Sequence, residues 1–150
     1  MVVERCSKCG RDDYQSPSVT VDAIATRNRN EDLELLMIKR GSKPPEWNGM
    51  WAFPGGFVDY GEDPEDAVIR ELLEETGVQG RFPVPLTILG KPRRDPRKHC
   101  IGLFYLVEVD SDSEPVGGDD AVDAKWVNIN KLTEQNVAGD HSKVIDILRE

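Results

Sequence analysis

Residues 55–78, with the sequence GGFVDYGEDPEDAVIRELLEETGV, are the most informative stretch of this 150-residue chain. We predict a helix over residues 64–76 within it. Asp63 is a favoured N-cap residue, Pro64 suits the first helical position, and Gly77 supplies a left-handed stop. The stretch therefore carries signals for both ends of one helix.

The predicted helix has an apolar face and an acidic face. Four residues follow the i, i+3, i+4, i+7 spacing of a buried stripe: Ile69, Leu72, Leu73 and Thr76. At about 3.6 residues per turn, Glu71, Glu74 and Glu75 fall on the opposite side. Glu71 and Glu75 are one turn apart, so their charges repel each other, more strongly where the local dielectric is low. This acidic face is either solvated or neutralised by a divalent cation, and carboxylate oxygens suit Mg²⁺ or Mn²⁺ rather than Zn²⁺.

Two neighbouring features favour the cation. Pro54, Gly55 and Gly56 precede the helix, and glycine lets the backbone approach a ligand or a metal closely. Arg70 lies four residues before Glu74 and is therefore placed to orient its carboxylate.

The same stretch resembles the Nudix box, Gly-x5-Glu-x7-Arg-Glu-U-x-Glu-Glu-x-Gly-U, in which U is a bulky apolar residue. Nine residues fill its fixed positions: Gly56, Glu62, Arg70, Glu71, Leu72, Glu74, Glu75, Gly77 and Val78. The resemblance implies an α/β protein with a Nudix-type α/β/α sandwich, in which a mixed β-sheet lies between helices, over residues 18–150. Residues 1–17 would form a polar N-terminal segment before this domain. The resemblance also implies hydrolysis of a nucleoside diphosphate linked to another moiety.

The resemblance further implies roles for the residues of the box. The metal ligands would be the Gly56 carbonyl, Glu71, Glu75 and, as a further ligand or as a base, Glu74. Glu74 and Glu71 are thus the candidate catalytic groups of the helix. Arg70 would orient Glu74, and Glu62 would support the site or a second ion.

In this family the catalytic base can also lie on a later loop. Asp119 and Asp120, in the sequence GGDDA at residues 117–121, are candidates on such a loop. The alternative is that both are ordinary turn residues.

Residues 93–99, RRDPRKH, are the one concentrated basic run in an acidic protein. Guanidinium groups of Arg94 and Arg97 suit phosphate oxygens, and Asp95 could accept from ribose hydroxyls or hold an arginine in place. The alternative is a solvated hairpin loop. Residues 94–97 resemble a loop of archaeal and bacterial ADP-ribose pyrophosphatases, although Lys98 stands where glycine is common in that loop.

Other candidate substrate contacts come from earlier loops and strands. Arg40 could reach a phosphate or be an exposed arginine at a strand end. Trp47, Trp51 and Tyr60 could stack on an adenine ring. For Trp51 and for Trp126, packing in the sheet core is the stronger interpretation.

The remaining chain indicates alternating strands and helices. Strands are expected at 19–26, 33–38, 51–53, 57–58, 84–89, 101–109 and 122–129, and a terminal helix at 142–149 with Val144, Ile145 and Leu148 inward. Residues 28–30 are expected to form a turn.

Composition limits the partners and the compartment. A net charge of −9 argues against general nucleic-acid or anionic-membrane binding. There is no apolar run that could span a bilayer and no secretory signal at the N-terminus, so we expect a cytoplasmic protein. Cys6 and Cys9 resemble half of a zinc knuckle without a second pair, either a remnant or part of an intermolecular site. A homodimer is possible.

Three functions follow from these features. The first is hydrolysis of ADP-ribose to AMP and ribose 5-phosphate. The second is Nudix hydrolysis of another substrate, such as NADH, a dinucleoside polyphosphate, a sugar nucleotide or a damaged nucleoside triphosphate. The third is a non-catalytic ADP-ribose sensor. Such regulators carry a C-terminal DNA-binding domain, whereas only residues 130–150 follow Ile129 here and every box carboxylate is present, so we expect an enzyme.

Overall fold

A computed structural model of the chain describes residues 15–119 and 121–150. The predicted N-terminal segment with Cys6 and Cys9 therefore lies almost wholly outside the described residues, and so does Asp120. None of the described helices is long and apolar enough to cross a membrane.

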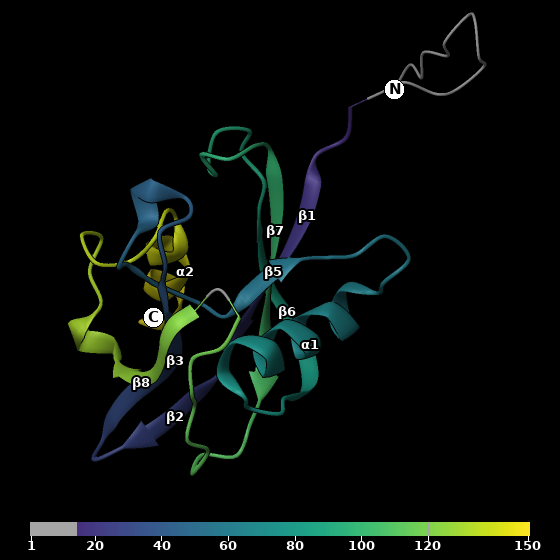
Figure 1. The fold of residues 1–150 in the computed structure, drawn as a ribbon. Helices are drawn as coiled ribbons and strands as arrows, with labels where there is room; N and C mark the ends of the chain where they lie inside the picture. Colours follow the sequence, from purple (N-terminus) through teal and green to yellow (C-terminus); the bar gives the residue numbers. More distant parts are fainter. Residues whose placement is uncertain (1–14, 120) are drawn as a thin grey trace, which may run out of the picture.

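The described residues alternate between short strands and two α-helices (Figure 1). In chain order the elements are β1 Ser18–Ile24, β2 Thr26–Arg29, β3 Asp32–Arg40, the 3-10 turn Pro45–Trp47, β4 Trp51–Ala52, β5 Gly55–Phe57, α1 Pro64–Thr76, β6 Arg81–Leu89, β7 Cys100–Glu108, β8 Ala121–Asn128, the 3-10 turn Ile129–Lys131 and α2 His141–Leu148.

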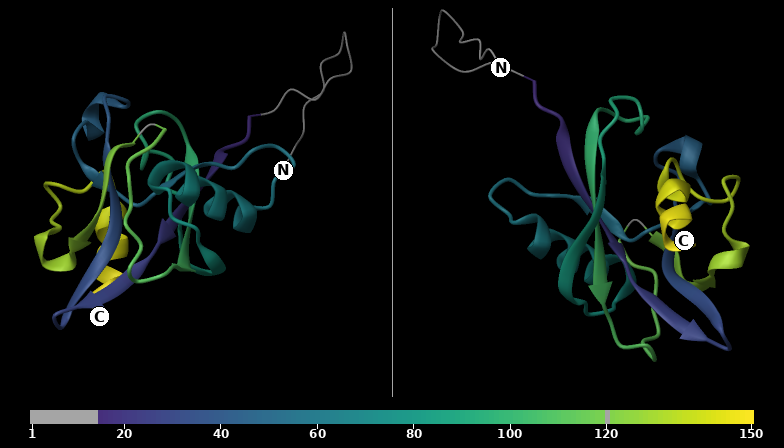
Figure 2. Two further views of the ribbon diagram at one scale, coloured as in Figure 1. Left: turned by 60° about the horizontal axis from the view of Figure 1, so that its bottom comes forward. Right: turned by 180° about the vertical axis from the view of Figure 1, so that it is seen from behind.

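The strands form two sheets that lie between the helices. One sheet has the order β5-β1-β7-β6, in which β1 and β7 are parallel and the outer pairs are antiparallel. In the other, β3 is central and pairs antiparallel with β8, β2 and β4. The views in Figure 2 place α1 and α2 on opposite sides of these strands. The α/β class and the arrangement of strands between helices are confirmed, with two sheets, one mixed and one antiparallel, in place of the single mixed sheet that was expected.

Side-chain alternation along β1 divides the core between the two helices. Val21 and Ala23 pack with Leu72 of α1, whereas Ile24 packs with Ile145 of α2. Successive strand residues point to opposite faces, so one strand supplies both cores. The strand β1 therefore contributes to the cores that pack against both α1 and α2.

The helix α1 begins and ends as predicted. The Asp63 carboxylate accepts from the Glu65 N–H, Pro64 is the first residue, and Gly77 ends the helix with φ 71°. Its buried face is rotated about the helix axis relative to the predicted one: Leu73, which was expected to be buried, is 44% exposed, whereas Glu71 and Glu75 are buried. The helix packs against β5 as well as against β1, so its acidic side faces protein rather than bulk water.

Two strands differ from the prediction for physical reasons. Residues 28 and 29 belong to β2, and the turn is the pair Asn30-Glu31, whose φ angles of 54° and 70° allow a two-residue hairpin. Strand β6 starts at Arg81 rather than at residue 84 and contains Pro83 and Pro85. It lies at a sheet edge, where proline is tolerated because one side needs no ladder hydrogen bonds.

Candidate functional site

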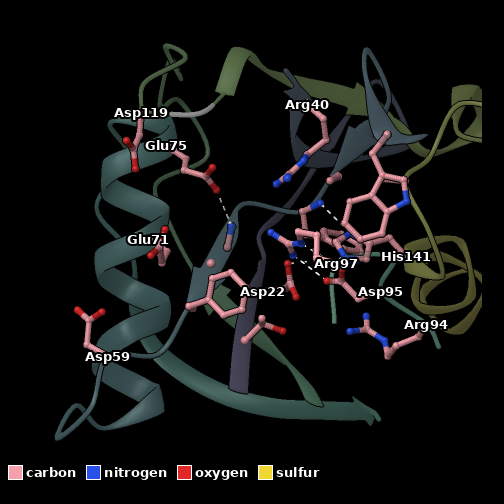
Figure 3. A pocket seen from close by; sticks show the side chains of 18 residues that line it. Asp22, Arg40, Asp59, Glu71, Glu75, Arg94, Asp95, Arg97, Asp119 and His141 are labelled. Atoms are coloured by element: carbon pink, nitrogen blue, oxygen red, sulfur yellow. Dashed lines mark hydrogen bonds and ion pairs between the residues drawn. The ribbon is translucent and has the colours of Figure 1, made fainter. Parts of the chain in front are cut away.

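A cleft of about 240 Å³ lies between α1 on one side and, on the other, the end of β3, the basic loop between β6 and β7 and the start of α2. Figure 3 shows Glu71, Glu75 and Asp119 on its helix side and Arg40, Arg97 and His141 on the other side. The cleft therefore has an acidic wall facing a basic and aromatic wall.

The acidic wall is held by the two glycines before α1. Glu75 is 3% exposed, and its Oε1 accepts from the Gly55 N–H at 2.7 Å. Glu71 is 9% exposed, and a Cβ on Gly56 would stand 2.6 Å from its carboxyl carbon and both carboxyl oxygens. Residue 56 must be glycine for the carboxylate to sit here, because no real Cβ tolerates that distance.

Burial makes these two carboxylates hard to ionise. Desolvation raises the pKa of Glu75 to about 8; the Gly55 hydrogen bond lowers this pKa and the nearby Glu71 raises it. Desolvation likewise raises the pKa of Glu71, against the opposing effect of its hydrogen bond from Arg70. Two desolvated acids one turn apart gain stability from any cation that reaches them.

Arg70 connects most of the acids of the box. Its Nε and Nη2 donate to Glu62 at 2.8 Å, and its Nη1 donates to Glu71 at 2.8 Å and to Glu74 at 3.2 Å. Its Nη2 also donates to the Phe57 carbonyl at 3.2 Å. The hydrogen bond from Arg70 lowers the pKa of Glu62 to about 2. Arg70 thus contacts Glu74, the acid that we expected it to orient, and also Glu62 and Glu71.

The acidic wall fits an oxygen-bound divalent cation. Gly56 leaves the space that a side chain would take beside Glu71, and Glu71 and Glu75 are the box carboxylates that line the cleft. Glu74 contacts Arg70 and does not line the cleft. In the described part of the chain no three His, Cys, Asp or Glu side chains are grouped closely enough to hold an ion by themselves. Water or substrate oxygens would complete the shell, as is usual for Mg²⁺.

On the opposite wall, Arg97 is fixed by Asp95. Its Nε and Nη2 donate to the two Asp95 carboxylate oxygens at 3.0 and 2.7 Å. Burial opposes ionisation of Asp95, but the Arg97 hydrogen bonds outweigh it and lower the pKa. The guanidinium also lies 5.6 Å from the Trp47 ring centre and 5.0 Å from that of Phe57. Asp95 therefore holds an arginine, one of the two roles predicted for it.

Arg94 is bound more deeply than Arg97. Its Nε and Nη2 each donate to an Asp140 carboxylate oxygen at 2.8 Å, and its side chain is 7% exposed. Asp140 immediately precedes α2. Arg94 lines the cleft, but its hydrogen bonds connect the basic loop to α2 and leave it few donors for a ligand.

Arg40 has an unused donor at the cleft. Its Nη2 donates to the Lys43 carbonyl at 2.8 Å, and its guanidinium lies 5.6 Å from the Trp47 ring centre. Among the buried side-chain atoms of the described residues, Arg40 Nε is the one without a hydrogen-bond partner. Of the three expected stacking residues, Trp47 lines the cleft and Trp51 and Tyr60 do not. Trp51 packs with the core on the α2 side and under Lys39.

The acidic loop after β7 reaches the C-terminal end of α1. The Val116 N–H donates to the Thr76 carbonyl at 2.9 Å, and the Gly118 N–H donates to the Glu75 carbonyl at 3.1 Å. These bonds use helix-end carbonyls that have no partner within the helix. They place Asp119, whose φ is 54°, at the cleft.

Among the cleft residues that were not predicted from the sequence are two buried ionisable groups, Asp22 and His141. Asp22 is a buried acid in the middle of β1, which is uncommon enough to have been a signal. His141 begins α2, and nothing in the sequence marks it. The Phe53 N–H donates to its Nδ1 at 3.2 Å, and burial lowers its pKa to about 4, so the ring is neutral.

Comparisons with known proteins agree with this arrangement. Residues 17–148 match the family model of the NUDIX domain. The chain is 39% identical over 132 residues, 88% of its length and 73% of the relative's, to a protein of Methanocaldococcus jannaschii named ADP-ribose pyrophosphatase. It is 28% identical over 90% of its length to an Acinetobacter baylyi protein named ADPR responsive transcriptional repressor NtrR, of which it spans 54%.

A solved structure has the same fold. It is the NUDIX domain of Shewanella oneidensis NrtR in complex with ADP ribose, with a TM-score of 0.80, 27% identity, and coverage of 91% of this chain and 88% of that one. With the family match over nearly the whole chain, these findings show that the protein belongs to the Nudix hydrolase family.

Proposed function

We propose that this pyrophosphohydrolase acts on ADP-ribose in the presence of Mg²⁺ or Mn²⁺ and releases AMP and ribose 5-phosphate. The observation that carries the proposal is the pairing, in one cleft, of two buried carboxylates on α1 with guanidinium groups on the opposite wall. A diphosphate carries negative charge on both phosphoryl groups, so it suits a cation on one side and arginines on the other. The names of the Methanocaldococcus relative and of the Shewanella complex support the choice of ADP-ribose.

Each residue has a defined task in this proposal. Glu71, Glu75 and the Gly56 carbonyl would hold the cation, which when bound neutralises phosphate charge and makes water a better nucleophile. Arg40 and Arg97 would bind the phosphate oxygens. Water adds to one phosphorus, the bond to the bridging oxygen breaks, and each product keeps one phosphate.

Two acids are candidates for taking the proton of the attacking water. Glu74 is half exposed and hydrogen-bonded to Arg70, while Asp119 lines the cleft from the later loop. The variants Glu74→Gln and Asp119→Asn separate the two candidates. Loss of the true base should lower kcat by about 100-fold or more and change the dependence of kcat on pH.

The test is a comparison of kcat/KM for a panel of nucleoside diphosphate derivatives with Mg²⁺. The panel contains ADP-ribose, NADH, diadenosine polyphosphate, ADP-glucose and 8-oxo-dGTP. We expect ADP-ribose among the best substrates. A different best substrate would refute the substrate assignment, and a protein that binds ADP-ribose without hydrolysing any member would be a sensor.

A second measurement addresses the basic wall. The variant Arg97→Ala should raise KM for ADP-ribose about 10-fold with a smaller loss of kcat, because Arg97 would bind a phosphate in both ground and transition states. Arg93→Ala is the matched control, since Arg93 is exposed in the same loop and does not line the cleft. An unchanged KM for Arg97→Ala would remove this loop from recognition.

A further inference from the structure

The floor of the cleft contains a buried acid that no step of the proposed reaction uses. Asp22 lies on β1, is 8% exposed, and lines the cleft with Thr20, which lies two residues earlier on the same face of the strand. In Figure 3 it lies between the acidic and the basic wall. A buried carboxylate needs hydrogen-bond donors, because leaving it without them is unfavourable.

The described residues supply little for this carboxylate. Its Oδ1 lies 3.8 Å from His141 Nε2, which is beyond hydrogen-bonding distance. Arg94 is bound to Asp140, and Arg97 is bound to Asp95. Asp22 therefore faces the cleft with acceptor capacity that a ligand can use.

A second unused group, of the opposite polarity, belongs to another residue that lines the same cleft. Arg40 Nε is a buried donor without a partner in the described part of the chain. Burial raises the pKa of Asp22 to about 7, and the positive charges of Arg94, Arg40 and Arg97 act against this rise. The residues that line the cleft therefore include an acceptor and a buried donor that the described part of the chain leaves without partners.

The charges around Asp22 decide which kind of group it would meet. An anionic phosphate oxygen would be repelled by the carboxylate. A divalent cation would be repelled by the surrounding arginines Arg40, Arg94 and Arg97. A neutral O–H or N–H donor meets neither objection and forms a charge-assisted hydrogen bond.

We propose that Asp22 is a specificity-determining residue that accepts a hydrogen bond from a neutral donor of the nucleotide, either a hydroxyl of the terminal sugar or the amino group of the base. The inference rests on the proposed function in that the ligand is a nucleoside diphosphate derivative. It adds the residue by which the enzyme distinguishes one such derivative from another.

The experiment compares wild type and Asp22→Asn on three substrates. These are ADP-ribose, IDP-ribose, which lacks the amino group of adenine, and the β-methyl ester of ADP, which lacks the terminal sugar. The variant should lose about 10- to 100-fold in kcat/KM on ADP-ribose, as expected for a hydrogen bond to a charged group. Asp66→Asn is the control, because Asp66 is exposed on α1 outside the cleft.

The two sources of the donor give different patterns. If the donor is the amino group, the loss disappears on IDP-ribose and persists on the methyl ester. If the donor is a hydroxyl of the terminal sugar, the loss disappears on the methyl ester and persists on IDP-ribose. An equal loss on all three substrates, or no loss on ADP-ribose, would overturn the proposal.

Three further readouts keep the result interpretable. Mn²⁺ affinity measured without nucleotide should be the same in wild type and Asp22→Asn, and a marked loss would make Asp22 a metal ligand instead. Thermal melting should show that Asp22→Asn is folded; if it is not, Asp22→Ser, which also removes the charged acceptor, takes its place with the same expected selectivity. If wild type hydrolyses none of the three substrates, the proposed function fails. Calorimetric binding of AMP and of ribose 5-phosphate to wild type and to Asp22→Asn then tests the role of Asp22 alone. Unchanged binding of both ligands in the variant would overturn the inference.

Discussion

At the scale of single residues, the cleft depends on two glycines, whose lack of a side chain leaves room for neighbouring groups. Gly56 lets β5 approach Glu71 of α1, and Gly55 lets β5 approach β1 while its N–H donates to Glu75. Both carboxylates are buried and have raised pKa values. The sequence placed both acids in the box. It did not show that they would be buried, because helical periodicity gives the direction of a side chain and not what packs against it.

We predict that Gly56→Ala lowers kcat by about 100-fold, because the added methyl group displaces the Glu71 carboxylate and misplacements near 1 Å have effects of this size. Steady-state kinetics with saturating Mg²⁺ measures the loss. Gly90→Ala is the matched control, since a Cβ there meets its nearest neighbours at ordinary distances of 3.7 and 3.8 Å. Equal activities of the two variants would contradict the assigned role of Gly56.

We predict that Glu75→Gln stabilises the metal-free protein at pH 8 by on the order of 2 kcal/mol. Burial raises the pKa of Glu75 from 4.5 to about 8, so between these values the folded state holds a proton that the unfolded state releases. Its contribution to stability is therefore present below pH 4.5 and is lost as the pH rises through 8. Glutamine keeps the acceptor for the Gly55 N–H and removes the charge.

Urea unfolding in EDTA at pH 5 and pH 8 measures this effect. The gain should be much smaller at pH 5, where Glu75 is protonated in the folded wild type. A variant less stable than wild type at pH 8 would show that the carboxylate is not strained by its burial.

At the scale of elements, the site is assembled by the docking of a loop on a helix end. The loop after β7 donates two backbone hydrogen bonds to the last carbonyls of α1, and Asp119 reaches the cleft from there. The boundaries of α1 could be predicted because caps are local signals. The exact strand limits of β2 and β6 could not, since they depend on pairing with residues distant in the chain and on the edge position that tolerates Pro83 and Pro85.

We predict that Gly118→Ala detaches this loop, because its Cβ would stand 2.6 Å from the Glu74 carbonyl oxygen. Amide exchange should accelerate at residues 116–118. Activity should fall markedly while the free energy of unfolding of the whole domain changes little. Gly90→Ala again provides the control. Unchanged protection of the Val116 and Gly118 amides would show that the loop is held by other contacts.

At the scale of the whole molecule, an acidic protein concentrates arginines on one wall of one cleft. The fold class and the box residues could be predicted because nine residues at fixed spacing carry the resemblance. Asp22 and His141 could not be assigned to the cleft, because β1 and α2 contribute them from opposite ends of the chain. The pairing of Arg94 with Asp140 could not be predicted either, because only the fold brings these two residues together.

We predict that Mg²⁺ raises the melting temperature more at pH 8 than at pH 6. A cation binds the ionised carboxylates, and the raised pKa values of Glu71 and Glu75 make protons competitors for the same oxygens at the lower pH. Differential scanning calorimetry at fixed ionic strength measures the shift. Glu75→Gln should abolish most of it, and an equal shift in that variant would place the cation elsewhere.

The central claim is that Glu71 and Glu75 hold a divalent cation against the diphosphate of a bound nucleotide. The most direct measurement is a crystal soaked with Mn²⁺ and a non-hydrolysable ADP-ribose analogue, with anomalous scattering used to locate the ion. The account predicts an anomalous peak within coordination distance of both carboxylates and of a diphosphate oxygen. A bound analogue with no ion beside these two side chains would contradict it.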